Sequence, residues 1–105
     1  MKRVIIESPY AGDVAGNEAY LRRCILDCLR RGEAPFASHR MYTDALDDVN
    51  PEERVLGIDA GFAWRHVAEL TVFYIDRGWS NGMRLGLAHC QLHGLPYEER
   101  SGVCA

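Results

Sequence analysis

Two short polar loops hold most of the side chains in this sequence that could do chemistry. The first, residues 8–12 (SPYAG), follows an apolar run that ends on Glu7. The second, residues 78–82 (GWSNG), follows an apolar run that ends just before Asp76. Each loop leads into a predicted helix, and helix N-termini present unsatisfied N–H groups and a partial positive charge that suit a phosphate or another anion. The simpler alternative is that the serines and glycines only cap helices and form tight turns.

The loops combine flexible backbone with polar and aromatic side chains. Gly12 and Gly82 allow the backbone to approach a ligand closely. The hydrogen-bonding and aromatic side chains of the two loops are Ser8, Tyr10, Trp79, Ser80 and Asn81. The two aromatic rings could stack on a nucleobase, or they could cover the end of the core.

Acids stand where two predicted strands end. Glu7 and Asp76 could bind ribose hydroxyls, or serve as a base or a nucleophile. Asp76 could equally pair with Arg77 or Arg84. His39 ends another predicted strand, and is therefore a better functional candidate than the histidines on the last helix.

We expect no metal and no cofactor. His89 and His93 lie four residues apart on a predicted helix, but two ligands do not make a metal site, and a solvated helix face explains them better. The apolar stretch after Met1 is too short for a signal peptide, so disulfides are not expected. Cys24, Cys28, Cys90 and Cys104 are therefore expected to be free thiols that behave as small hydrophobic residues.

The elements that must position these residues alternate between strands and helices. Strands are predicted at 3–7, 35–39 and 70–75, with a possible edge strand at 96–99, and helices at 17–31, from the Asn50-Pro51 start onward, and at 80–93, while 40–50 is expected to be a loop. This alternation predicts a single domain, residues 1–105, of α/β class: a small Rossmann-like three-layer sandwich with a mostly parallel sheet of four or five strands. Ligands of such sheets bind beyond the carboxyl ends of the strands, where Glu7, His39, Asp76 and both loops should collect.

Composition excludes some partners and favours another. The net charge of -3 leaves no basic footprint for nucleic acid, no apolar run is long enough to span a membrane, and a cytoplasmic location is expected. A domain this small buries only part of its surface, so a homo-oligomer is expected. Gly57 and Gly61 could let the middle helix approach a second subunit or its own sheet closely. Phe62 and Trp64 point to different sides of that helix, so one of them should be exposed.

The two loops also resemble a known family. The motifs S/G-P-Y/M-x-G-x4-N and, after a later strand, D-x-G-x-S-x-G are matched by residues 8–12 with Asn17, and by Asp76, Gly78, Ser80 and Gly82. The chain in this respect resembles the nucleoside 2-deoxyribosyltransferase-like superfamily, and most of all its small phage and actinobacterial domains of unknown function. The resemblance implies a Rossmann-like sheet, a homo-oligomer and a pocket for a nucleoside or nucleotide. Catalytic members carry a nucleophilic glutamate four residues after the last glycine, where this chain has Gly86.

The candidate functions follow from the motifs and the missing glutamate. The candidate ligand-binding residues are Glu7, Ser8, Pro9, Tyr10, Gly12, Asn17, His39, Asp76, Gly78, Trp79, Ser80, Asn81, Gly82 and Arg84. We expect a protein that binds a nucleotide or an ADP-ribose-like nucleotide-sugar without turning it over; if phage-encoded, it would act in the host cytoplasm as a sponge for a defence signal. The alternative is an N-glycoside hydrolase or deoxyribosyltransferase that uses Glu7 or Asp76. A structural or interaction domain with a vestigial pocket is the third possibility.

Overall fold

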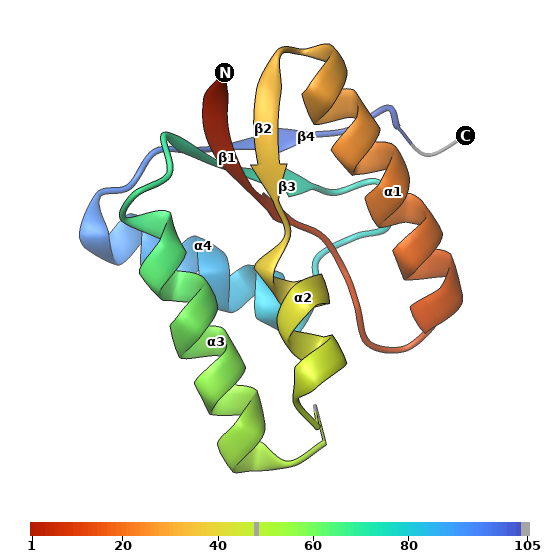
Figure 1. Ribbon diagram of the computed structural model, residues 1–105, viewed down its shortest axis with the longest axis vertical. Coiled ribbons are helices and arrows are strands. Elements are labelled where there is room, and N and C mark those ends of the chain that lie inside the picture. Colours follow the sequence, from red (N-terminus) through yellow and green to blue (C-terminus); the bar gives the residue numbers. More distant parts are fainter. Residues whose placement is uncertain (48, 104–105) are drawn as a thin grey trace.

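A four-stranded, fully parallel sheet forms the centre of the molecule, with strands in the order β2-β1-β3-β4 (Figure 1). The computed structural model describes residues 1–47 and 49–103. Within them the elements are β1 (Lys2–Glu7), α1 (Val14–Arg30), β2 (Glu33–Phe36), α2 (Ser38–Ala45), α3 (Pro51–Arg65), β3 (Leu70–Tyr74), α4 (Asn81–His93) and β4 (Tyr97–Arg100). The predicted α/β class and the parallel Rossmann-like sheet are confirmed.

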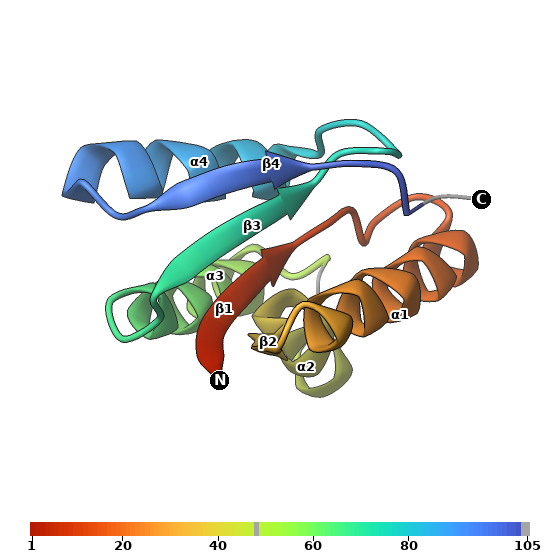
Figure 2. The ribbon, with the colours of Figure 1, turned by 90° about the horizontal axis from the view of Figure 1, so that it is seen from above.

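Helices cover both faces of the sheet, which explains why the central strands are apolar throughout. On one face, Val4, Ile6 and Val72 pack against the Tyr20 and Leu21 side of α1. On the other face, Phe73 packs against Met83 and Cys90 of α4, and α3 lies beside α4 (Figure 2). The molecule is therefore a three-layer sandwich.

Capping residues fix the ends of three helices. The Asn50 side chain accepts hydrogen bonds from the N–H groups of Glu52 and Glu53, and α3 begins at Pro51, as predicted. Gly94, at a φ of 64°, ends α4. The first helix starts earlier than the predicted position 17, because Asp13 caps it and accepts from the N–H of Gly16 at 3.1 Å.

The segment after β2 differs from the sequence prediction. The strand ends at Phe36 rather than at His39, and residues 38–45 form helix α2 instead of a loop. No side chain caps α2, so the sequence offered no start signal. The helix is stabilised instead by packing on α3, where a β-carbon on Gly61 would lie only 2.8 Å from Ser38 Oγ. The glycine face of α3 thus packs against its own chain.

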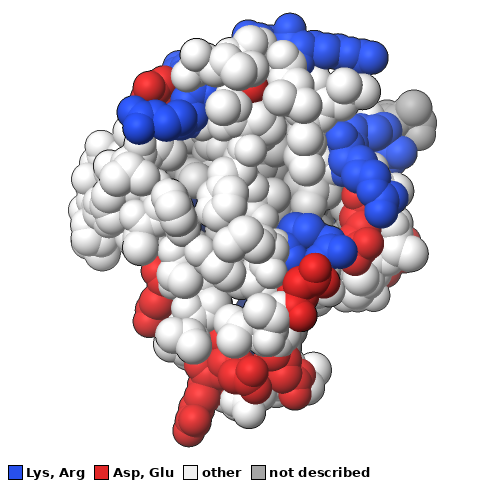
Figure 3. All heavy atoms as spheres, in the orientation of Figure 1, with Lys and Arg blue, Asp and Glu red and all other residues white. Residues whose placement is uncertain are grey.

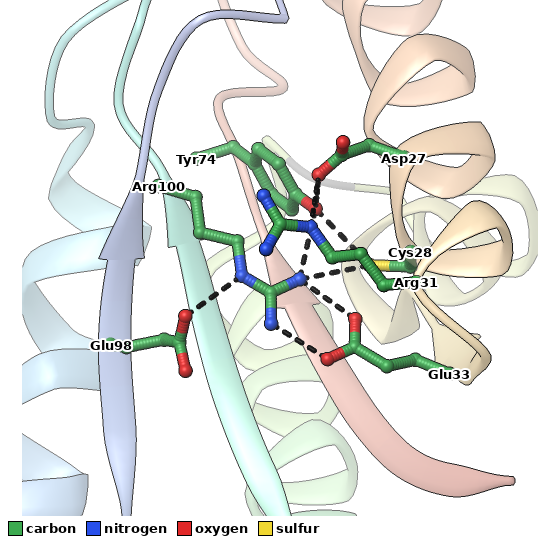
Figure 4. A network of polar contacts seen from close by, with 7 residues as sticks. All are labelled: Asp27, Cys28, Arg31, Glu33, Tyr74, Glu98 and Arg100. Atoms are coloured by element: carbon green, nitrogen blue, oxygen red, sulfur yellow. Dashed lines mark hydrogen bonds and ion pairs between the residues drawn. The ribbon is translucent and has the colours of Figure 1, made fainter.

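A buried polar network joins the two edge strands across the α1 face (Figure 4). Arg100 of β4 donates two hydrogen bonds of 2.7 Å to the Glu33 carboxylate of β2, and a third of 3.2 Å to the hydroxyl of Tyr74. The Tyr74 hydroxyl in turn donates to Asp27 of α1 at 2.7 Å. Because β2 and β4 do not neighbour each other in the sheet, this network fixes their relative position.

The described cysteines behave as predicted. Cys24, Cys28 and Cys90 are buried free thiols, and burial raises the pKa of Cys24 to about 12. Cys104 lies outside the described residues. Among residues 1–47 and 49–103, none of the helices is both long and apolar enough to cross a membrane.

Candidate functional site

A cavity of about 240 Å³ opens where the carboxyl end of β1 meets α2, α3 and the start of α4. Seven of the predicted residues line this main cavity: Glu7, Ser8, Tyr10, His39, Ser80, Asn81 and Gly82. They come from three separate stretches of the sequence, and the parallel topology brings them together as predicted. Figure 3 shows the charged side chains on one face of the molecule. The Lys and Arg side chains form several separate groups, and many of the Asp and Glu side chains lie at the bottom of the view, near the start of α3.

A buried ion pair forms part of the main cavity wall. The Arg65 Nη2 of α3 donates to Glu7 Oε1 at the end of β1, and the two side chains are only 2% and 9% exposed. Burial raises the pKa of Glu7 to about 7, although the Arg65 charge and hydrogen bond act in the opposite direction. Sequence reasoning missed Arg65. A signal was present, because Gly57, Gly61 and Arg65 follow each other at four-residue spacing on one helix face.

The raised pKa of Glu7 predicts a pH dependence of stability. Folded Glu7 keeps its proton up to a pH of about 7, whereas the unfolded chain releases it near the ordinary value of 4.5. Wild-type protein should therefore lose roughly 3 kcal/mol of stability relative to Glu7→Gln as the pH rises through this interval. Urea denaturation of both proteins from pH 4.5 to 8 measures the difference. The lowered pKa of His39 makes stability rise with pH by the same amount in both proteins, so its effect cancels in the comparison. A difference in stability between the two proteins that does not change with pH would contradict the prediction.

A serine–histidine hydrogen bond lies beside the ion pair. His39 Nε2 and Ser8 Oγ are 3.1 Å apart. Burial, together with the nearby positive charges of Arg65 and Arg40, lowers the pKa of His39 to about 4, so its ring is neutral at pH 7. Three buried nitrogens of His39 and Arg65 have no hydrogen-bond partner among the described residues. They are His39 Nδ1, Arg65 Nε and Arg65 Nη1. Buried polar atoms without partners are rare and costly, and an ordered water or a ligand would supply the partners that these nitrogens lack.

Gly86 packs directly against the ion pair. A β-carbon at this position would lie 2.7 Å from Arg65 Nη2 and 3.1 Å from Glu7 Oε2. A glutamate side chain therefore has no room here. The residue that the resemblance aligns with a catalytic glutamate instead allows Arg65 and Glu7 to approach the helix backbone.

A second, side cavity of about 400 Å³ collects three other predicted residues, Pro9, Asn17 and Trp79, and shares Ser80 with the main cavity. Asn17 holds the first loop by donating to the carbonyls of Tyr10 and Ala11 at 3.0 and 3.1 Å, and it accepts from Arg77 Nε at 2.8 Å. The Asp13 carboxylate already occupies the N-terminus of α1. Of the two helix N-termini expected to bind an anion, only the start of α4 therefore remains a candidate. There Ser80 Oγ caps the helix by accepting from the N–H of Met83.

Four predicted residues line neither of these two cavities. Asp76 accepts from the Tyr20 hydroxyl and from the N–H of Gly102, both at 2.7 Å. Gly12 and Gly78 form turns at φ values of 92° and 85°. The Arg84 side chain is exposed on α4. Trp79 faces the side cavity and packs on Phe73, with ring centroids 5.2 Å apart.

A histidine cluster forms between the ends of α3 and α4. His66 joins His89 and His93, with ring centroids 4.6–5.4 Å apart. Within the part of the chain that the structure describes, no group of three histidine, cysteine or acidic side chains has a geometry that could hold a metal ion.

Comparison with known proteins gives one match. No curated protein and no solved structure matches the chain. Residues 2–100 match a family described as a domain of unknown function, DUF7768. This span includes every element of the fold and both cavities, and the chain therefore belongs to the DUF7768 family.

Proposed function

We propose that the protein binds a nucleoside or nucleotide, including ADP-ribose-like nucleotide-sugars, in the main cavity without turning it over. The observation that carries the proposal is that His39 and Arg65 line this cavity and that three of their side-chain nitrogens are buried without a hydrogen-bond partner among the described residues. A ligand that supplies hydrogen-bond partners to these atoms would remove the energetic cost of leaving them unpaired.

The size and lining of the cavity fit the nucleoside part of such a ligand. Its volume of about 240 Å³ lies just below the range of about 300–1,000 Å³ typical of small-molecule sites. This volume leaves room for no more than the nucleoside part of the ligand, so further phosphate or sugar groups would extend outward. The rings of Tyr10 and Tyr42 line the cavity and offer surfaces for a base. The start of α4 at Ser80–Gly82 offers N–H groups to a phosphate.

The ion pair beside Gly86 favours binding over turnover. Where a nucleophilic carboxylate would form a covalent intermediate, the chain has a glycine packed under Arg65 and Glu7. In a phage, a protein that retains the ligand intact could lower the free concentration of a host nucleotide signal. This role as a sponge rests on the resemblance and on the missing glutamate.

A thermal-shift screen tests the proposal. Nucleosides, nucleotides, NAD, ADP-ribose and cyclic derivatives are added to the wild-type protein, and each mixture is then analysed by chromatography. A ligand at about 100 times its dissociation constant stabilises the native state by roughly 2.7 kcal/mol. We expect at least one nucleoside-containing ligand to raise the melting temperature and to be recovered intact. A complete screen without any shift would contradict the proposal.

A second candidate function is hydrolysis of an N-glycosidic bond with Glu7 as the general base. The observation that favours it is the position of Glu7 in the main cavity with a pKa near 7, which suits proton transfer at neutral pH. Asp76 is no longer a candidate base, because Tyr20 and Gly102 occupy its carboxylate. Recovery of free base from the screen, abolished by Glu7→Gln, would support this candidate.

We also propose that the chain forms a homodimer through the outer face of α3. Leu56 and Trp64 of α3 are 60% and 47% exposed, and Val67, in the turn just after the helix, is 56% exposed. Antiparallel pairing with a second copy would place the acidic first turn, Glu52 and Glu53, beside His66 of its partner. Light scattering should give twice the chain mass of 11.8 kDa, and Leu56→Glu should shift the protein to monomer. A wild-type monomer at high concentration would contradict this proposal.

A further inference from the structure

Three polar side chains that line the main cavity, Glu7, Arg65 and His39, include both hydrogen-bond donors and an acceptor. Arg65 is 3% exposed and has Nε and Nη1 without partners, and His39 Nδ1 is buried without one. If Ser8 donates to His39 Nε2, the neutral ring carries its proton on Nδ1, and all three free nitrogens are donors. The Glu7 carboxylate lies among them as an acceptor. We call these three side chains the polar base.

The charges of the polar base balance. Arg65 carries a positive charge, Glu7 carries a negative one above pH 7, and His39 is neutral. A phosphate placed here would meet the Glu7 carboxylate, and an ammonium group would meet the Arg65 guanidinium. The ligand group that suits the polar base is therefore uncharged and both donates and accepts, as neighbouring hydroxyls do.

Aromatic side chains favour a sugar at the polar base over the edge of a nucleobase. The Phe62 ring already has two partners. The Arg65 guanidinium lies 4.6 Å from the Phe62 ring centroid, and the His89 ring stacks on Phe62 with the ring centroids 4.2 Å apart. The rings that remain for a base belong to Tyr10, on the loop after β1, and Tyr42, on α2. A nucleobase stacked on either tyrosine ring would place its attached sugar next to the side chains of Glu7, Arg65 and His39.

We infer that the polar base is a subsite for the vicinal hydroxyls of a ribose, so that the protein takes ribonucleosides in preference to 2′-deoxyribonucleosides. The inference rests on the proposed nucleoside binding. A ribose can donate one hydroxyl proton to Glu7 and accept from Arg65 and His39 with its oxygens. A 2′-deoxyribose lacks one of these oxygens and leaves a buried donor unpaired. Sites built to bind a hydroxyl reject analogues without it much more strongly than apolar pockets reject a change of size.

The test compares matched ligands on the wild-type protein, so no variant has to fold. Isothermal titration at pH 8, where Glu7 is charged, measures dissociation constants for the ribo and 2′-deoxyribo forms of adenosine, guanosine, cytidine and uridine. We expect the deoxy form of each bound nucleoside to bind at least about 10-fold more weakly. Two results would overturn the ribose subsite without contradicting nucleoside binding. One is ribo and deoxy affinities within about twofold of each other, and the other is affinities that depend only on which nucleobase the ligand carries. If neither form of any nucleoside binds, the proposed function fails together with the subsite.

A conservative variant checks that the polar base causes the preference. Glu7→Gln keeps the shape of the side chain but replaces one acceptor oxygen with a donor. We expect the ratio of ribo to deoxy affinity to fall toward one, while binding of the deoxy form changes less than about threefold. Glu99→Gln, at an exposed position of β4, is the matched control and should keep the wild-type ratio. An unchanged ratio in Glu7→Gln would overturn the assignment of Glu7 to the subsite.

Discussion

Replacing Arg100 with methionine should lower the free energy of unfolding by about 3–5 kcal/mol, because breaking a buried ion pair leaves a buried charge without compensation. Arg100 and Glu33 have side chains only 5% and 9% exposed and share two hydrogen bonds of 2.7 Å. The Tyr74 hydroxyl also loses its Arg100 partner. Urea denaturation followed by circular dichroism measures the change.

Arg3→Met is the matched control for Arg100→Met. Arg3 also pairs with a glutamate, Glu69, but at 3.4 Å and with the two side chains 67% and 44% exposed. Exposed pairs of this kind contribute about 0–1 kcal/mol. The double variant Arg100→Met/Glu33→Leu removes both charges and should recover much of the loss. Equal destabilisation by Arg100→Met and Arg3→Met would show that the network in Figure 4 does not hold the edge strands together.

Replacing Arg65 with methionine should destabilise the protein and abolish ligand binding. The variant leaves Glu7 buried without its cation, which costs about 3–5 kcal/mol when the carboxylate is charged. The loss should be smaller below pH 6, because Glu7 then carries a proton. The variant also removes two of the three unpartnered nitrogens of the main cavity.

The binding part of the Arg65→Met prediction is measured at pH 6, where more of the variant remains folded. The dissociation constant for the best ligand of the thermal-shift screen should rise at least about 100-fold, because several hydrogen bonds to a charged donor are lost. Arg84→Met, an exposed arginine on α4, is the control and should stay within about 0.5 kcal/mol of wild type in stability. Folded Arg65→Met protein with wild-type affinity would remove Arg65 from the site.

The sequence was sufficient where local signals and topology agree. Apolar runs at Val4 and Val72 predicted the two central strands, and Asn50 and Gly94 predicted helix ends. Parallel strands then required the loops around Ser8 and Ser80 to meet at one edge, which they do. These features depend on short-range patterns and on one general rule of sheet topology.

The missed features depend on contacts between residues far apart in the sequence. Helix α2 has no capping side chain and is stabilised by packing on the glycines of α3. Arg65 and Glu7 are 58 positions apart, so no local pattern could pair them. Asp76 looked like a site acid because it ends a strand, but its carboxylate accepts from Tyr20 and Gly102. Only the fold shows which partners each of these acids has and which of them lines the main cavity.

The most direct test of nucleoside binding in the main cavity is to map the bound ligand by NMR. Backbone amide spectra of ¹⁵N-labelled wild-type protein are recorded while the best ligand of the screen is added. The proposed function predicts saturable shifts centred on Ser8, His39 and residues 80–83, with little change at Asp13 and Arg77 of the side cavity. Shifts confined to the side cavity, or no saturable shift with any nucleoside-containing ligand, would contradict it.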